Sequence, residues 1–237
     1  TFLSKNKEFN GSISLLITGD EEGDAVNGTK KVVEYLKKRK EKIDFCLVGE
    51  PTNPNKLGEM IKIGRRGSLT GKLIIFGQQG HVAYPQRANN PSTIIVKILK
   101  ELKDIKFDKG SKNFQPTNFE VTKININNSA DNVIPAMAEA TFNIRFNNKH
   151  TSNSLKQKIN KFLIKINKKN KSKFRIDYRV SGEAFLTKPN ETTHMIQKII
   201  KKVTKIKPKL STTGGTSDLR FIRKISPGLE FGLVGKT

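Results

Sequence analysis

The chain has 237 residues and carries 45 lysines and arginines against 21 aspartates and glutamates, which gives a formal net charge of +24 at pH 7. This length allows one large or two modest domains, and no apolar run approaches the roughly 20 residues of a membrane-spanning helix. The single cysteine, Cys46, excludes an internal disulfide framework. Together these features predict a soluble, cytoplasmic protein with no membrane partner.

The positive charge raises the question of nucleic-acid binding, because clustered cations displace counterions from phosphate backbones. The lysines, however, are scattered along the chain, tryptophan is absent, and only 7% of the residues are aromatic. Neither a stacking platform nor an RNA-binding signature is visible in the sequence. We therefore expect no specific nucleic-acid partner and attribute to the charge a general attraction for anionic substrates.

In chain order, the first predicted element is a buried strand over Ser12–Thr18, a short apolar run bounded by glycines. A helix is predicted from about residue 27 to Lys40, with an apolar stripe between lysines. A second short apolar strand covers Ile43–Val48. A strand, a helix and a strand within roughly thirty residues make a βαβ unit, whose two strands are normally parallel.

Acidic residues follow both predicted strands: Asp20, Glu21 and Glu22 come after the first, and Glu50 comes after the second. In a parallel sheet these residues emerge at the same carboxyl edge, where open α/β sheets bind ligands. Carboxylates crowded beside an apolar sheet repel one another unless water, a cation or a basic partner compensates them. The pattern leaves two interpretations open, namely a cation site or acids that cap loops and helix starts.

A different pattern begins at Gly67. Alternating and helical periodicities predict six elements, namely strand 68–76, helix 91–105, strand 118–127, strand 138–147, helix 154–167 and strand 173–180. This β-α-β-β-α-β order is that of the ferredoxin-like split unit. We expect an inserted lid over residues 67–181.

After Gly182 the α/β pattern returns, with a helix over 189–206, a glycine turn that opens another short helix, and a strand from Leu229 to Val234. We expect these elements to complete the first sheet. The predicted fold class is α/β, with a parallel-rich sheet interrupted by the α+β lid. Residues 1–66 form the first part of a catalytic domain, and residues 182–237 form its second part.

Seven motifs occur in order along the chain. They are TGDEEG at 18–23, GEPT at 49–52, GRRGS at 64–68, GQQGHVAYP at 77–85, NVIPA at 132–136, FNIRF at 142–146 and TTGGTSDLRFI at 212–222. With these motifs the chain resembles the succinyl-diaminopimelate desuccinylases of the di-zinc aminoacylase and carboxypeptidase superfamily, peptidase family M20 type. The resemblance implies a zinc-exopeptidase-like catalytic domain and a lid that also serves for dimerisation.

The resemblance further implies two zinc ions per subunit, with cobalt or manganese as possible substitutes. Glu21 matches the family's general base and acid, and Glu22 and Glu50 match ligands to different metals. Carboxylates suit these ions, and a two-metal site polarises a carbonyl and activates water. Asp20 matches no ligand, and we expect it to hold its loop by accepting backbone hydrogen bonds.

His81 lies in the GQQGHVAYP motif. The family's matching histidine reaches from the lid of one subunit into the active site of its partner and stabilises the oxyanion of the tetrahedral intermediate. The resemblance therefore implies a homodimer formed through the lid. His150 and His194 are at predicted helix starts without such a context, and we expect them to be surface residues.

Substrate recognition falls, on the same resemblance, to groups that bind carboxylates. Arg65 and Arg145 match arginines that bind substrate carboxylates, Asn132 matches an amide near the same site, and we expect Arg66 to be structural. A glycine turn is expected to cradle another carboxylate with its backbone N–H groups at a helix N-terminus. The residues of this turn are Thr213, Gly214, Gly215, Thr216 and Ser217.

The sequence also departs from the family pattern. The upstream histidine motif, the metal-bridging aspartate and the terminal histidine ligand are absent, and the chain begins without Met and ends inside an apparent strand. We therefore expect a fragment that binds two metals weakly and is inactive alone. Thr213 stands where serine is common and Leu219 where glycine is common, which leaves the substrate preference open.

The expected reaction is cleavage of N-succinyl-LL-2,6-diaminopimelate to succinate and LL-2,6-diaminopimelate, a step in the synthesis of lysine and of peptidoglycan precursors. The nearest alternative is another deacylase or dipeptidase of the superfamily, such as an acetylornithine deacetylase. A non-catalytic dimerisation module is an alternative of another class, and a nucleic-acid binder is the third.

Overall fold

The computed structural model describes residues 2–6, 8–21, 23, 25–170 and 172–235. The chain divides into two compact units, Thr1–Glu41 and Lys42–Thr237. The predicted division into residues 1–66, 67–181 and 182–237 follows function and remains a prediction.

The smaller unit contains α1 (Phe2–Lys5) and α2 (Thr29–Lys38), and α2 confirms the predicted helix. The strand predicted over Ser12–Thr18 is wrong, because this segment is not in a strand and Leu15 and Ile17 are 86% and 83% exposed. A strand is held by a ladder of hydrogen bonds to a neighbouring strand, and none of the described strands pairs with this segment. The predicted βαβ unit is therefore not formed.

The larger unit contains a mixed four-stranded sheet with the strand order β1–β12–β2–β11. Its strands are β1 (Cys46–Val48), β2 (Met60–Lys62), β11 (Lys209–Ser211) and β12 (Gly228–Glu230). β1 pairs parallel with β12, and β11 pairs parallel with β2, whereas β12 and β2 are antiparallel. The strand predicted at Ile43–Val48 is confirmed in part, but its neighbour is β12 and not the N-terminal segment.

Helix α5 (Glu191–Thr204) packs against this sheet, where Ile200 joins Ile61 and Leu229 in a small core. A capping box at Asn190 starts the helix, as the sequence chemistry favours. Three shorter elements complete this region: β3 (Gly64–Arg65), its antiparallel partner β10 (Phe185–Leu186), and α6 (Leu219–Ile222). The sequence predicted α6 but not β3 or β10.

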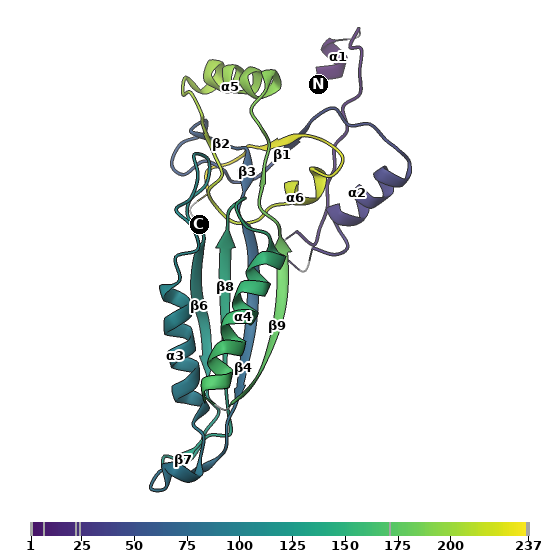
Figure 1. Cartoon of the computed structure of the whole chain (residues 1–237). Helices are drawn as coiled ribbons and strands as arrows, with labels where there is room; N and C mark the ends of the chain where they lie inside the picture. The colour runs from purple at the N-terminus through teal and green to yellow at the C-terminus, as the bar shows by residue number, and fades with distance from the viewer. Residues whose placement is uncertain (1, 7, 22, 24, 171, 236–237) are drawn as a thin grey trace. The chain divides into compact units, whose positions relative to one another are not determined.

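The lid is a four-stranded antiparallel sheet with the order β6–β8–β4–β9 and two helices on one face (Figure 1). Its elements are β4 (Gly67–Phe76), α3 (Pro91–Asp104), β6 (Asn118–Asn125), β8 (Met137–Phe146), α4 (Ser152–Asn170) and β9 (Lys173–Gly182). The predicted β-α-β-β-α-β order is confirmed, with boundaries within a few residues of those expected.

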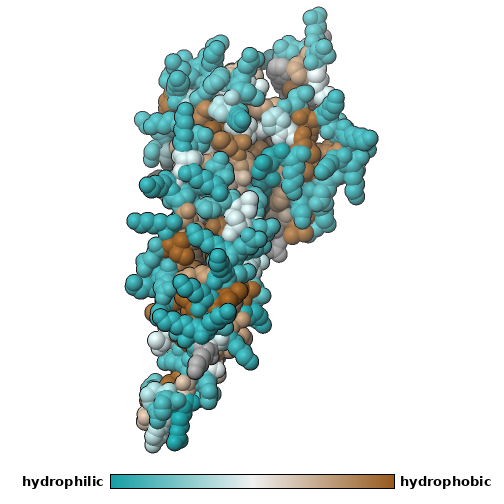
Figure 2. Space-filling view, in the orientation of Figure 1, coloured by the Kyte–Doolittle hydropathy of each residue, from teal (hydrophilic) through white to brown (hydrophobic). Residues whose placement is uncertain are grey.

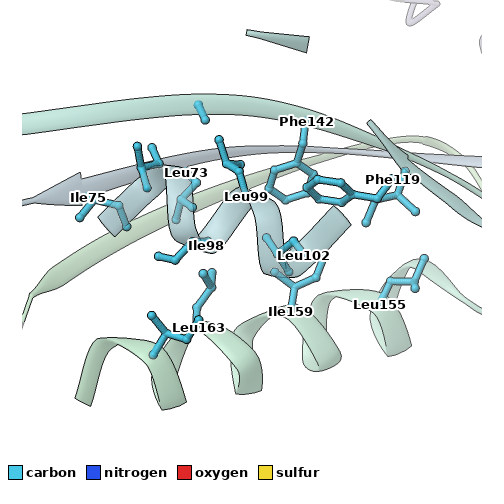
Figure 3. Close-up of a cluster of buried hydrophobic side chains, with 14 of the residues drawn as sticks. Leu73, Ile75, Ile98, Leu99, Leu102, Phe119, Phe142, Leu155, Ile159 and Leu163 are labelled. Carbon is cyan, nitrogen blue, oxygen red and sulfur yellow. The ribbon is translucent and has the colours of Figure 1, made fainter. Parts of the chain in front are cut away.

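The hydrophobic core of the lid lies between the sheet and its two helices. Figure 3 shows side chains of the helices, such as Leu102 and Ile159, directed towards Phe142 and Phe119 of the strands. Phe142 alternates along β8 with half-buried polar residues, so the opposite face of this sheet is polar. Over α3 and α4 the outer surface is mostly hydrophilic, with small apolar patches between charged side chains (Figure 2).

A short two-stranded ribbon lies beyond one end of the lid sheet, where Figure 1 labels β7. It consists of β5 (Gly80–His81) and β7 (Val133–Ile134), which pair antiparallel, and η1 (Pro85–Arg87) follows β5. Among the described residues, no helix is both long and apolar enough to cross a membrane.

The lid core yields a stability prediction. Leu102 is fully buried, so Leu102→Ala should lower the free energy of unfolding by about 2–5 kcal/mol, because it removes apolar contacts and leaves a cavity. Val96 lies on the same helix and is 56% exposed, so Val96→Ala should change the free energy of unfolding by less than about 0.5 kcal/mol. Urea unfolding of both variants checks this, and equal effects would contradict the helix orientation.

Candidate active site

The loop that carries the acidic motif is tied together by Asp20. Its Oδ2 accepts hydrogen bonds from the backbone N–H groups of Val26 and Asn27, both at 2.8 Å. Asp20 has a left-handed backbone with φ of 63°, which places its side chain back over the loop. The predicted structural role of Asp20 is therefore confirmed. Glu21 lies half-buried in the same loop, and Glu22 lies outside the described residues.

Glu50 follows β1 and is half-buried, with its backbone against Gly232. The strand that was expected to place Glu21 at the sheet edge beside Glu50 is not formed. Glu21 belongs to the smaller unit and Glu50 to the larger one, so their meeting at a metal site stays a prediction. Within the described ranges, no three His, Cys, Asp or Glu side chains lie together as a metal site would require. The described residues therefore do not assemble the donor set of the predicted zinc ions.

The glycine turn is held by a buried ion pair between Arg65 and Glu230. Arg65 Nε donates to Glu230 Oε2 at 2.7 Å, its second nitrogen contacts the same oxygen, and the third donates to the carbonyl of Thr213 at 3.2 Å. The other oxygen of Glu230 accepts from the hydroxyl of Ser217. Glu230 is fully buried, so this network fixes both ends of the turn. Arg65, predicted to bind substrate, is thus occupied by bonds within the chain.

Lys62 supports the turn from a second side. Its Nζ donates to Thr213 Oγ1 at 2.6 Å, and Thr213 Oγ1 is 2.9 Å from the hydroxyl oxygen of Ser211. The pKa of Lys62 is lowered to about 8, chiefly by burial and also by the nearby Arg65 charge, while Glu230 acts in the opposite direction. Near neutral pH, Lys62 therefore places a partly desolvated positive charge beneath the turn.

The turn presents its backbone to solvent. Gly214 has φ of +103° and lies directly against a nitrogen of Arg65, so a side chain here would collide with the ion pair. Gly215 has open space where a side chain would project. The following helix, α6, has only four residues, so its dipole adds little to anion binding. A cavity of about 320 Å³ adjoins Thr213, between 210–213 and the lid segment 111–115.

Arg145 lies on the polar face of the lid sheet. It is opposite Ser68 on β4 and Asn118 on β6. Its side chain is half-buried, and one terminal nitrogen is shielded from solvent without a hydrogen-bond partner. Arg66 donates to Asn118 Oδ1 at 2.8 Å, and its Nε is likewise buried and unpartnered.

His81 and Asn132 come together at the β5–β7 ribbon. The Nδ1 of His81 accepts from the backbone N–H of Ala83 at 3.1 Å, so its neutral ring carries the proton on Nε2. This Nε2 lies 3.5 Å from the side-chain nitrogen of Asn132 on the exposed surface. Because an amide nitrogen is itself a donor, it does not accept the Nε2 proton. The ring edge thus offers a hydrogen-bond donor to a ligand.

Arg145 and His81, both predicted to act on the substrate, lie at opposite ends of the lid strands. Arg145 pairs with Ser68 at the start of β4, whereas His81 lies beyond Phe76 at its end. Eight residues of antiparallel strand span roughly 27 Å at ~3.4 Å per residue. One chain therefore does not bring His81 to Arg145.

Sequence reasoning missed two charged residues of the site, Lys62 and Glu230. Each is a single charged residue within a short apolar run. Such a run predicts burial, and a buried charge needs a partner, so this pattern could have identified both residues. The expectation that His150 is a surface residue is also wrong. Its side chain is only 18% exposed, and its Nε2 lies 3.2 Å from Asp108 Oδ2. His194 is exposed, as expected.

Comparison with known proteins gives agreeing results. Residues 63–171 match the family model described as a peptidase dimerisation domain. Over 236 residues the chain is 77% identical to the succinyl-diaminopimelate desuccinylase of Pelagibacter ubique, with 100% of this chain and 62% of that protein covered. The desuccinylase of Parvibaculum lavamentivorans is 51% identical over 97% of this chain and 58% of its own length. The chain spans about three fifths of the length of these relatives.

Among solved structures, aminopeptidase PepT from Bacillus cereus has a similar fold. The TM-score is 0.76 at 16% identity, and the match covers 97% of this chain and 58% of that one. At this identity the likeness concerns the fold alone. It agrees with the predicted fold class, a parallel-rich α/β sheet interrupted by an α+β lid.

The buried amine of Lys62 yields a pH prediction. Between about pH 8 and 10.5 the folded chain has released the Lys62 proton while the unfolded chain still holds it, so folding stability from this group rises with pH. Relative to Lys62→Met, the wild type should gain stability across this range, with a slope of at most about 1.4 kcal/mol per pH unit.

Urea unfolding at several pH values from 7 to about 10.5 measures this slope. Lys97 is exposed on α3, and Lys97→Met serves as the matched control with no such dependence. A wild type that tracks Lys62→Met at every pH would mean that the Lys62 ammonium is not desolvated.

Proposed function

Because the chain belongs to the succinyl-diaminopimelate desuccinylase family, we propose that the protein hydrolyses N-succinyl-LL-2,6-diaminopimelate to succinate and LL-2,6-diaminopimelate. The observation that carries the proposal is the 77% identity to the Pelagibacter ubique desuccinylase over the full chain. The reaction would supply a precursor of lysine and peptidoglycan. In this proposal the enzyme works in the cytoplasm.

The charges around the glycine turn support a polyanionic substrate. N-succinyl-LL-2,6-diaminopimelate carries three carboxylates, and Lys62 and Arg65 both contact Thr213 of the turn. We propose that Arg145 binds one carboxylate directly, while residues 213–217 bind another through their backbone. Arg65, which is bonded to Glu230, would act by holding the turn in place.

The chemistry would use Glu21 as the proton carrier. A carboxylate at this position can accept a proton from the attacking water and return it to the leaving amine. The loop that Asp20 ties together would keep Glu21 oriented for both transfers. His81 would donate from Nε2 to the oxyanion of the tetrahedral intermediate.

We propose a homodimer as the active form. The separation of His81 from Arg145 within one chain supports this, since the two can serve one substrate only if His81 comes from a second copy. The dimerisation-domain match at residues 63–171 covers β4, α3, β6 and β8 of the lid. Asn132 would enter the partner's site together with His81, because the two side chains are adjacent.

We propose two zinc ions per subunit as the cofactor, with cobalt or manganese as substitutes, and Glu22 and Glu50 among their ligands. Carboxylates are suitable ligands for these ions. This part of the proposal rests on the family, because the described residues do not assemble a donor set.

The proposal is tested on the protein purified from its intact gene. We expect succinate release from N-succinyl-LL-2,6-diaminopimelate, about two zinc ions per chain, and loss of activity on chelation that zinc restores. N-acetylated diamino acids should react more slowly. Faster turnover of the acetyl substrates would instead indicate another deacylase, and a metal-free, inactive protein would indicate a non-catalytic dimerisation module.

The shared site predicts complementation between two inactive variants. His81→Ala and Arg145→Gln should each be nearly inactive as homodimers, but a mixed dimer contains one site with both residues intact. After co-refolding of equal amounts, activity should return to about one quarter of the wild-type value, as random pairing of a symmetric dimer requires. The control is a co-refolded mixture of two variants that both lack His81, which should stay inactive. A mixture that stays as inactive as its components would contradict the shared site.

A further inference from the structure

The loop between α3 and β6, residues 105–117, extends from the lid to the glycine turn, and both belong to the larger unit. The backbone carbonyl of Asn113 in this loop accepts a hydrogen bond from the hydroxyl of Thr212. Thr212 directly precedes Thr213, the first residue of the turn, and is buried. The lid therefore contacts the chain at the point where the turn begins.

Asp108 ties the two ends of this α3–β6 loop together. Its Oδ1 accepts from the backbone N–H of Gly110 at 2.5 Å and from the side-chain amide of Asn147 at 2.6 Å, and its Oδ2 accepts from the backbone N–H of Thr117 at 3.2 Å. Burial raises the pKa of Asp108, but hydrogen bonds from these three residues outweigh burial and lower the pKa to about 2. The carboxylate is therefore ionised near neutral pH, and its charge strengthens the hydrogen bonds that it accepts.

Asn147 joins the same loop to the end of β8. It is fully buried, and its side-chain nitrogen also donates to the carbonyl of Gln115 at 3.1 Å. Its backbone N–H donates to the hydroxyl oxygen of Thr117 at 3.3 Å. Because Asn147 follows β8 immediately and Arg145 lies two residues before it, the loop is anchored to the strand end that carries Arg145.

The tip of the loop is a tight turn. The N–H of Ser111 donates to the carbonyl of Phe114 at 2.9 Å, and the N–H of Phe114 donates to the carbonyl of Ser111 at 3.3 Å. Gly110 precedes this turn with φ of +78°, and a side-chain carbon there would lie 2.7 Å from the Phe114 carbonyl oxygen, so the conformation requires glycine. Phe114 is itself buried. These contacts hold the carbonyl of Asn113 in place to accept from Thr212.

A cavity of about 320 Å³ lies between this tip and β11. Residues 111–115 line one side, and residues 210–213 line the other together with Ile63. Among the residues that the structure describes, the hydrogen bond from Thr212 to Asn113 is the one that links the two sides. Groups that face a void lose the packing contacts they would otherwise make. The position of the turn relative to the tip therefore depends strongly on this hydrogen bond.

We propose that the α3–β6 loop is a brace that sets the distance between the glycine turn and the lid, with Asp108, Asn147 and Thr212 as positioning residues. Lys62 and Arg65 already hold the turn from the side of the mixed sheet. A substrate whose carboxylates are bound by the turn and by the lid needs this distance to be fixed, because small misplacements weaken its binding. The inference rests on the proposed function for the role of the turn, and none of the three positioning residues touches the substrate.

The first test removes the hydrogen bond between the brace and the turn in the protein from its intact gene. Thr212→Val deletes the hydroxyl and keeps the shape, so KM for N-succinyl-LL-2,6-diaminopimelate should rise about three- to tenfold, with kcat changed by less than about threefold. Thr212→Ser keeps the hydroxyl and should restore most of the affinity. The matched control, Thr204→Val, deletes a hydroxyl that donates to the carbonyl of Ile200 within α5 at 2.8 Å, and it should keep the wild-type KM.

The second test asks whether Asp108 acts through the same hydrogen bond. Asp108→Asn places an amide nitrogen among hydrogen-bond donors and should raise KM by a similar factor. The double variant with Thr212→Val should have a KM within about twofold of the more affected single variant, because the second change removes nothing further. Effects that multiply would show that Asp108 and Thr212 act independently, and would contradict the brace. If Asp108→Asn does not fold, Gly110→Ala takes its place, since it disturbs the tip directly.

A readout without substrate separates this inference from the proposed function. Thr212→Val should speed hydrogen–deuterium exchange of the backbone at 109–117 and 213–217, whereas Thr204→Val should not. If the wild type releases no succinate but exchange follows this pattern, the brace stands and the proposed reaction fails. If the wild type is active and Thr212→Val keeps its KM, the brace is wrong and the reaction stands, whatever the exchange shows.

Discussion

The buried ion pair between Arg65 and Glu230 is the interaction on which the site depends. It joins β3 to β12 across 165 residues of sequence, in a place where an unpaired charge would cost several kcal/mol. All three nitrogens of Arg65 and both oxygens of Glu230 have partners, two of which belong to the glycine turn. The ion pair thus converts a flexible glycine-rich segment into a fixed one. It also explains Gly214, because only a residue without a side chain can lie against Arg65 at this positive φ.

One face of the lid sheet packs into the hydrophobic core, and the other face carries polar side chains, among them Arg145. Along β8, alternate residues such as Phe142 and Ile144 enter the core, while Asn143 and Arg145 lie on the opposite face. A shift of the register by one residue would exchange the faces and bury the arginine in the core. The packing of Phe142 against the helices therefore also fixes Arg145 opposite Ser68 and Asn118. The apolar core thereby keeps the residues of the polar face in register.

Much of the lid could be predicted from the sequence, since its strands and helices are long enough to show their periods. The α3 segment has apolar residues at helical spacing and a proline at its start, and it ends within a residue of the expected boundary. Strands β2, β3, β10 and β11 have two or three residues each, which is too short for any period. The strand prediction for Ser12–Thr18 was wrong for another reason. The composition of this segment favours a strand, but a strand also needs a neighbouring strand, which composition does not reveal.

The site was less predictable than the fold, because roles depend on partners distant in sequence. Motifs predicted both Arg65 and Arg145 to bind carboxylates, yet Arg65 is bonded to Glu230, whereas one buried nitrogen of Arg145 has no hydrogen-bond partner. The difference between exposed and fixed cations also bears on the net charge of +24. Exposed lysines provide only a diffuse, salt-screened attraction, whereas a specific site needs cations with fixed geometry. Burial brings the pKa of Lys62 to about 8, but an arginine in similar surroundings stays charged. For an anion site that works throughout the neutral pH range, arginine is therefore better suited than lysine.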